Sequence, residues 1–259
     1  HSMTRNTHAK DIDWFLLNQS EALSGRSEKG LEKMIEAYGK LSKKNQIDYK
    51  YSFVQTLLKL NQVKKAREEL NEISEEELKK EPKWNIPKAR ALRQAGRFEE
   101  AMKLAETALS DASSREEKEP SLVADALVEK ARIEFDQGEI SKAEKSAKHA
   151  LETYTRAFAS YLVLADISYK KKEYKEAVEF IKKALEQNPY LSEAYIKAGD
   201  AYMEMDNAKE ALENYKKASE IYPGYLKTHE SLVRAYKKLG QEELMKKELE
   251  QIENMEKQI

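Results

Sequence analysis

Apolar residues recur along the chain in paired segments, each with helical spacing. In the segment 192–225, apolar or small residues fall three or four positions apart, which places them on one face of a helix. A polar break at Asp206 and Asn207 separates two such stripes, and Pro223 follows the second, where it cannot continue a helix interior. The stripes consist of Tyr195, Ala198, Gly199 and Tyr202, and then of Ala211, Tyr215 and Ala218. The pattern predicts two helices joined by a short turn.

The same scheme returns at a constant interval before and after this segment. Small residues such as Ala165 and Ala177, or Gly199 and Ala211, stand where the two helices of one unit would touch, and large residues such as Tyr215 fill the space between them. The shifted copies contain Tyr161, Leu164, Ala165, Ala177, Ile181, Ala184 and Pro189 upstream, and His229, Leu232, Val233, Tyr236, Gly240, Met245, Leu249 and Ile252 downstream.

This spacing resembles the tetratricopeptide repeat family, whose pattern is W-x2-L-G-x2-Y, then A-x3-F, then P, in a 34-residue frame. The resemblance implies an all-α fold, a right-handed superhelical solenoid of about seven helix-turn-helix repeats. It also implies that the first helix of each repeat lines a concave groove.

The frame divides the chain into four expected parts. Residues 1–10 are expected to be a tag remnant and a disordered N-terminus, because His1-Ser2-Met3 resembles what a cloning or cleavage site leaves behind. Residues 11–115 hold three looser repeats, 116–123 form an eight-residue insertion, and 124–259 hold four repeats continuous with the first three. In the third repeat, Pro87 is expected to be the first helical residue, which leaves residues 82–86 irregular.

Composition agrees with a helical protein and narrows its partners. Hydrophobic residues make up 40% of the 259 residues and charged residues 36%, with only eight Gly and five Pro, which favours helices over strands and turns. Lys and Arg number 46 against 47 Asp and Glu, so the basic excess of a nucleic-acid-binding protein is lacking. No apolar run reaches membrane-spanning length. A cytoplasmic location is expected, and export with a removed signal peptide is the alternative.

No pattern in the chain points to catalysis, a cofactor or a metal. The chain has no Cys, and its histidines, His1, His8, His149 and His229, form no HxxxH or HExxH pair. Neither a G-x-G-x-x-G nor a G-x4-G-K-[ST] phosphate cradle occurs. The sequence therefore predicts a protein that is not an enzyme.

A run of basic residues marks the candidate binding site. Between Pro82 and Phe98 the charged residues are all basic, and the groove register adds Arg132 from the next repeat. Arg side chains bind carboxylates through two parallel hydrogen bonds, so Arg90, Arg93 and Arg132 are candidates to bind an acidic group, with Phe135 and Tyr169 as apolar neighbours. The alternative is a solvated helix face whose Arg stems cover apolar surface. The basic run is Lys83, Lys88, Arg90, Arg93 and Arg97.

Two acids extend the candidate groove toward the C-terminus. Asp166 and Asp200 are one repeat apart, and the same register places Met203 on the groove side. The acids are candidates to receive a basic residue or backbone amides of a partner, and the alternative is pairing with neighbouring Lys or Arg. Members of the family that bind chaperone tails carry a Lys and Asn carboxylate clamp, which is lacking at Leu162 and Asp166 here.

The expected function is that of a non-enzymatic adaptor that binds a protein or an extended peptide, an acidic one included, in the groove of the superhelix. The alternative is a self-assembling scaffold that uses repeat ends or the convex face, so a homo-oligomer is also considered.

Overall fold

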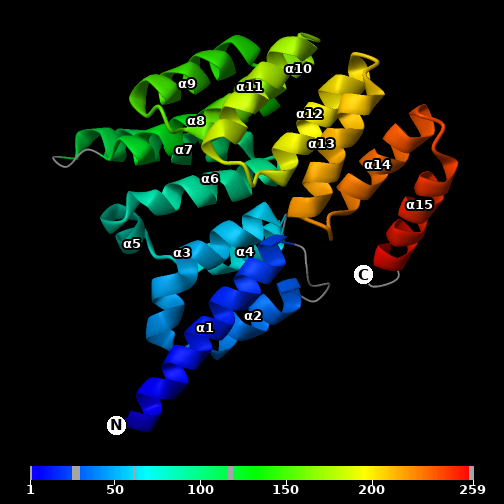
Figure 1. The fold of residues 1–259 in the computed structure, drawn as a ribbon. Helices are drawn as coiled ribbons and strands as arrows, with labels where there is room; N and C mark the ends of the chain where they lie inside the picture. The colour runs from blue at the N-terminus through cyan, green and yellow to red at the C-terminus, as the bar shows by residue number, and fades with distance from the viewer. Residues whose placement is uncertain (1, 25–29, 61, 116–118, 257–259) are drawn as a thin grey trace. The chain divides into compact units, whose positions relative to one another are not determined.

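The computed structural model describes residues 2–24, 30–60, 62–115 and 119–256. Over these ranges the chain forms fifteen α-helices and one 3-10 helix, η1, and no strand (Figure 1). The all-α helical-repeat solenoid predicted from the sequence is confirmed. The elements are α1 Ser2–Ser24, α2 Gly30–Lys40, α3 Lys43–Lys59, α4 Val63–Asn71, α5 Glu75–Lys80, η1 Pro82–Trp84, α6 Asn85–Gln94, α7 Phe98–Ser114, α8 Pro120–Asp136, α9 Ile140–Thr153, α10 Phe158–Lys170, α11 Tyr174–Gln187, α12 Ser192–Glu204, α13 Ala208–Ile221, α14 Leu226–Lys238 and α15 Glu242–Glu256.

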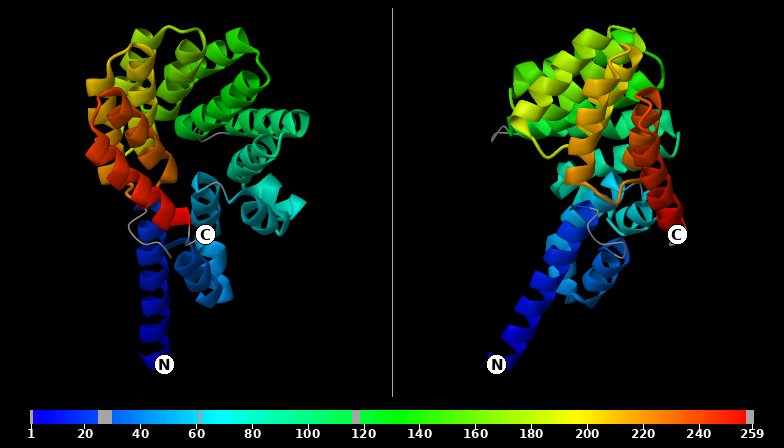
Figure 2. Two further views of the ribbon diagram at one scale, coloured as in Figure 1. Left: turned by 90° about the vertical axis from the view of Figure 1, so that its right-hand side faces the viewer. Right: turned by 45° about the vertical axis from the view of Figure 1, so that its right-hand side comes forward.

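The helices divide into two compact units, each described here by itself. One unit is Ile47–Lys170, and the other combines His1–Gln46 with Lys171–Ile259. Within each unit, helices that follow one another in the chain pack against one another, as in the pairs α6 with α7, α8 with α9, and α12 with α13 (Figures 1 and 2). This nearest-neighbour packing is what a repeat array requires, since each repeat buries its apolar face only against the next helix.

Small residues line the helix contacts of the unit Ile47–Lys170. Four alanines, Ala101, Ala105, Ala108 and Ala112, are fully buried along one stripe of α7. Because each of these side chains is a single methyl group, neighbouring helices approach closely. Ile86 packs against Ala108 and Ala112 of α7 and against Ala126 of α8.

The turn between the two helices of a repeat has a fixed backbone conformation. Gly138, Lys172, Asp206 and Gly240 all have positive φ and follow one another at the interval of one repeat, and Gly96 takes the same conformation in the third repeat. Residues in this left-handed backbone conformation terminate helices, and glycine adopts the conformation without a steric cost. The interval from Gly96 to Gly138 exceeds one repeat by the length of the expected insertion 116–123.

Helix α6 begins earlier than expected. The 3-10 helix η1 covers Pro82–Trp84 and α6 begins at Asn85, so the expectation of an irregular segment up to Ile86 is wrong. Pro87 lies within the first turn of α6, where backbone N–H groups have no partner inside the helix, so a proline costs no hydrogen bond there.

The second repeat departs from the two-helix scheme. Helix α4 has nine residues, against fourteen in α9, α11 and α13, and a separate six-residue helix, α5, follows it. Ser74 starts α5 with a capping box, in which its hydroxyl accepts from the Glu77 N–H and the Glu77 carboxylate accepts from the Ser74 N–H.

The insertion lengthens the helix that follows it. Residues 116–118 lie outside the described residues, and α8 begins at Pro120, at or next to its first helical position. Helix α8 therefore has 17 residues, against 13 in α10 and α12.

In the unit that contains Lys171–Ile259, the packing of α12 on α13 depends on Gly199. A Cβ atom at this position would overlap the ring of Tyr215, which is fully buried. Tyr215 belongs to an apolar cluster with Ile196, Leu212, Leu232 and Tyr236, so one glycine admits a fully buried tyrosine ring to this core.

At the N-terminal end, α1 begins at Ser2, whereas the sequence predicts disorder up to residue 10. Phe15 of α1 is fully buried and its ring lies 5.7 Å from that of Tyr38 on α2. Trp14, on the same helix, has the Lys40 ammonium 4.7 Å from its ring centroid. Over the described residues, no helix is both long and apolar enough to cross a membrane.

Candidate partner-binding surface

The candidate surface lies on first helices of the unit Ile47–Lys170, namely α3, α6, α8 and α10. Its centre is an ion-pair network around Glu129 on α8, whose carboxylate is fully buried. Arg90 Nε and Arg93 Nε, both from α6, donate to its two oxygens at 3.2 and 2.8 Å. The side chains of Arg90 and Arg93 are only 20% and 14% exposed, so all three groups are largely shielded from solvent.

Further hydrogen bonds fix the two guanidinium groups. Arg90 Nη1 donates to Gln55 Oε1 of α3 at 2.9 Å, and Arg93 Nη1 donates to Asp136 Oδ2 at the end of α8 at 2.7 Å. The network thus joins three successive first helices. Asp136 is its most accessible acid, with a side chain 33% exposed. We refer to Gln55, Arg90, Arg93, Glu129 and Asp136 as the arginine network.

Burial and charge act in opposite directions on the acids here. Burial favours the neutral form of Glu129, but Arg90, Arg93 and Arg132 outweigh it and hold the pKa of Glu129 below its ordinary value. Asp125, one turn earlier on α8, has a raised pKa because burial outweighs the attraction of Arg90 and Arg132. Burial, aided by repulsion from Arg90, lowers the pKa of Lys59.

Glu129 does not stand out in the sequence as a candidate site residue, because of its neighbours in the chain. Leu127, Val128 and Ala131 are buried, so Glu129 stands within an apolar stretch of α8. A lone acid among buried residues was the available signal, because a buried carboxylate requires a cationic partner. Its partners precede it by 36 and 39 positions, beyond the reach of any local pattern.

The structure separates the basic run of the third repeat. Arg90 and Arg93 belong to the arginine network, whereas Arg97 pairs with Glu100 through two hydrogen bonds of 2.6 and 2.5 Å. Lys83 pairs with Glu81 at 2.8 Å, and the Lys88 ammonium lies 3.4 Å from the Ile73 carbonyl oxygen. Residues 88 and 90 are two positions apart on a helix, so their side chains leave it in nearly opposite directions.

The other expected residues of this unit lie on α8 and α10. Arg132 is half-buried and close enough to Glu129 and Asp125 to shift both pKa values. Phe135 is half-buried and has the Lys170 ammonium 5.0 Å from its ring centroid. Asp166 and Tyr169 are also half-buried, on α10.

Asp200 and Met203 belong to the other unit, on α12. Asp200 Oδ1 accepts from the Tyr215 hydroxyl at 2.7 Å and from Arg234 Nη2 at 2.8 Å. Met203 is half-buried and packs against the apolar cluster of Tyr215. Asp200 therefore has the cationic neighbour that the alternative interpretation of this acid predicts.

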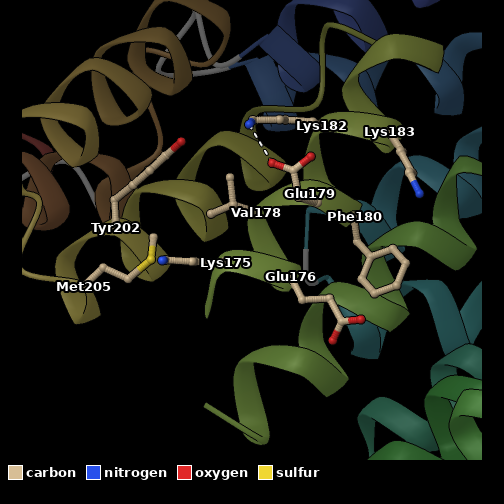
Figure 3. A pocket seen from close by; sticks show the side chains of 9 residues that line it. All are labelled: Lys175, Glu176, Val178, Glu179, Phe180, Lys182, Lys183, Tyr202 and Met205. Carbon is tan, nitrogen blue, oxygen red and sulfur yellow. Dashed lines mark hydrogen bonds and ion pairs between the residues drawn. The ribbon is translucent and has the colours of Figure 1, made fainter. Parts of the chain in front are cut away.

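The last three repeats carry two hollows whose linings largely correspond. One has a volume of about 510 Å³ and lies between α11 and the end of α12 (Figure 3). The second, of about 480 Å³, is lined mostly by the equivalents one repeat on, so Val178 and Met205 correspond to Leu212 and Leu239. Both are rimmed by Lys and Glu, with a Lys182–Glu179 ion pair at 2.7 Å in the first (Figure 3) and Lys216–Glu213 at 3.2 Å in the second. Mixed charges and a periodic origin make them features of the repeat packing.

Metal ligation has no support in the described residues. Over these ranges, no group of three or more His, Asp or Glu side chains could hold a metal ion.

Two models of the tetratricopeptide repeat match the sequence, one over residues 51–117 and 128–192 and another over 192–225. Together they span more than half of the chain. The chain belongs to the tetratricopeptide repeat family. Members of this family are helical-repeat scaffolds for protein interactions, and this chain is such a repeat scaffold. No curated protein is significantly similar to it in sequence.

Solved structures share the fold at low sequence identity. BtubC from P. vanneervenii is 16% identical with a TM-score of 0.61, over 78% of this chain and 91% of its own. TTC0263, a thermophilic repeat protein of this family from Thermus thermophilus, is 17% identical with a TM-score of 0.56, over 67% and 91%. A MamA fragment from Desulfovibrio magneticus RS-1 is 18% identical with a TM-score of 0.53, over 68% and 95%.

Proposed function

We propose that the first-helix surface around the arginine network binds an extended, carboxylate-bearing segment of a partner protein. The observation that carries the proposal is that Arg93 is fixed by buried Glu129 on one side and donates to surface Asp136 on the other. Guanidinium groups bind carboxylates through directed hydrogen bonds, and an ordered side chain loses less entropy on binding.

Asp136 occupies the place that a partner carboxylate would take. It is a partly exposed acid at the end of α8, whereas Glu129 is inaccessible. A carboxylate of the partner would replace Asp136 at Arg93 Nη1 and leave the Glu129 pairs intact. Arg132, next to the network on α8, would add a second positive charge to the binding surface.

The flanking residues suggest how the rest of the segment is held. Phe135 and Tyr169 offer aromatic surface beside the basic centre, and Asp166 on α10 would attract a basic residue of the same segment. A basic centre beside an acidic neighbour gives the bound segment a preferred direction. In the unit that contains Lys171–Ile259, Asp200 and Met203 are proposed separately as partner contacts.

The test compares two variants of opposite expected sign. Reversing Arg90 and Arg93 to Glu is uninformative, because it strands buried Glu129 among like charges and destabilises the fold. Asp136→Asn removes the competing acid, so binding of fluorescent acidic peptides from a random library should tighten, whereas Arg132→Gln should weaken it. Each change is expected to be about fivefold, the size of an exposed charge pair.

The control is Glu139→Gln, which removes an exposed acid three residues further on that pairs with Lys142. This variant should bind like the parent. If Asp136→Asn and Arg132→Gln also bind acidic peptides like the parent, the arginine network serves only to join the helices.

Self-assembly is a second candidate, favoured by the terminal helices. Among the described residues, four of the six exposed large hydrophobic side chains lie on α1 and α15, namely Leu16, Leu17, Leu244 and Leu249. Light scattering over a concentration range tests this: an assembling chain gains mass with concentration, and Leu244→Lys with Leu249→Lys should abolish the gain. A strict monomer at high concentration would rule the scaffold out.

A further inference from the structure

The unit Ile47–Lys170 contains a pocket, away from the arginine network, that arises where the second repeat departs from the repeat scheme. Helix α4 stops at Asn71, five residues short of the fourteen that α9, α11 and α13 have, and the short helix α5 follows it. The resulting space has a volume of about 260 Å³ and is bounded by α4, α5, α6 and α7. We name it the α5 pocket.

The α5 pocket combines an apolar floor with a basic rim. Its lining includes Leu70, Leu78, Leu92 and Leu104, one leucine from each of the four helices, which we call the floor. Among the described residues that line it, the charged ones are Arg67, Lys88 and Arg97, all basic, and we call them the rim. The two hollows on the last three repeats differ, because each has both Lys and Glu in its lining.

Among the described side chains, one acid lies next to the three cations of the rim. The acid Glu100 is held beside it by two hydrogen bonds from Arg97. Arg67 also acts on Glu100 and helps to lower the pKa of that carboxyl, after the contribution of Arg97. Among the described residues that line the pocket, the charged side chains are thus three cations, and Glu100 beside them offsets one.

The size of the pocket indicates what it holds. Small-molecule sites usually measure about 300–1,000 Å³, so the α5 pocket is below that range. A leucine floor favours an apolar side chain over a free phosphate, which needs polar donors around it. We infer that the α5 pocket is a second protein-docking site, which takes a large apolar side chain from a partner segment whose neighbouring residues are Asp or Glu.

This inference is independent of the site proposed on the arginine network. Lys88 and Arg97 leave the third repeat on a different side from Arg90 and Arg93, as their separate partners show.

The test is a selection from a random peptide library on the full chain. Peptides are counter-selected against a variant with Leu78→Glu and Arg67→Glu, which places carboxylates on the floor and rim. We expect the surviving peptides to share one or two large apolar residues flanked by Asp or Glu. Arg67→Glu alone should weaken a selected peptide by about tenfold. Phe135→Ala, which changes the other surface, should leave its affinity unchanged.

Three results would overturn the inference. Selected peptides that are neutral or basic would do so, as would the absence of any peptide that survives counter-selection. Peptides that lose affinity with Phe135→Ala but tolerate Leu78→Ser would belong to the arginine network, which would leave the proposed function standing. Circular dichroism melting of each variant verifies that it is folded, and Leu78→Ser provides a milder change if Leu78→Glu is unstable.

Discussion

Arg93 donates to the fully buried carboxylate of Glu129 at 2.8 Å, and this contact connects two repeats whose residues are 36 positions apart in the chain. The pair is shared with Arg90, so one carboxylate satisfies two cations. A buried carboxylate without a partner is costly, and the network is therefore a structural tie as well as part of the proposed binding surface.

Removal of Glu129 tests the structural role. Glu129→Ala leaves Arg90 and Arg93 facing each other in a largely buried site, and we expect the free energy of unfolding to fall by roughly 3 kcal/mol. Urea unfolding followed by circular dichroism measures it. Glu139→Ala, which breaks only an exposed pair, should change it by less than about 1 kcal/mol. Similar values for the two variants would contradict the structural role.

Acid should weaken the ion pairs of Glu129 with Arg90 and Arg93. The pKa of Glu129 is held below its ordinary value, so its contribution to stability is present at neutral pH and is lost as the pH falls through that lowered pKa. The loss of stability on acidification should therefore be smaller in Glu129→Gln than in the parent. Equal losses would contradict the assignment.

Gly199 should tolerate no side chain. The Tyr215 ring occupies the space that a Cβ atom at position 199 would need, so Gly199→Ala should destabilise the protein by about 1–3 kcal/mol through overpacking. The double variant with Tyr215→Leu should recover part of this loss, because a smaller side chain frees the space. Thermal unfolding of the three variants forms the cycle, and simple additivity would show that the two positions are not coupled.

Substitutions at the positive-φ turn positions Gly138 and Lys172 should change stability in opposite directions. Gly138→Ala forces a side chain into positive φ and should cost about 1 kcal/mol, whereas Lys172→Gly relieves the same strain one repeat later. Lys172 is exposed, so no packing is lost in the second variant. A lower melting temperature for Lys172→Gly would contradict the prediction.

His229 should make the docking of the last helix depend on pH. Its Nδ1 lies 2.7 Å from a Glu248 oxygen on α15 and its Nε2 lies 2.6 Å from the Pro223 carbonyl oxygen, so both ring nitrogens face acceptors. The hydrogen bond to Glu248 is the largest cause of its raised pKa, followed by the opposing effect of burial and the bond to Pro223.

Because the folded pKa is raised, this contribution is present below the ordinary value of 6.5 and is lost as the pH rises through the folded value. Amide exchange of α15, corrected for the intrinsic effect of pH, should speed up relative to α12 over that window. His229→Gln should remove the pH dependence. A parent protein with no change in α15 protection across the window would contradict the prediction.

The sequence by itself determined the fold, because the repeat is recognised from the spacing of small and apolar residues that lie close together in the chain. Small residues such as Ala177 and Ala211, one repeat apart, specify how closely two helices approach, and the turn recurs at the same interval. The second repeat was harder, because a break after Asn71 and a new start at Ser74 lie within what resembles one continuous helical segment. The helix start expected at Pro87 was wrong because proline is accommodated throughout the first turn of a helix, and it does not mark the first residue.

Only the tertiary structure decided what the charged residues contact. Arg90, Arg93 and Arg97 form one basic run in the sequence, but the helix directs Arg97 to Glu100 and the other two to Glu129, which comes from the next repeat. Charge pairing acts between side chains that the packing of helices brings together, whatever their separation in the chain. Hydrophobic spacing is local and can be read from a sequence, whereas the partner of an arginine is known only once the repeats are packed.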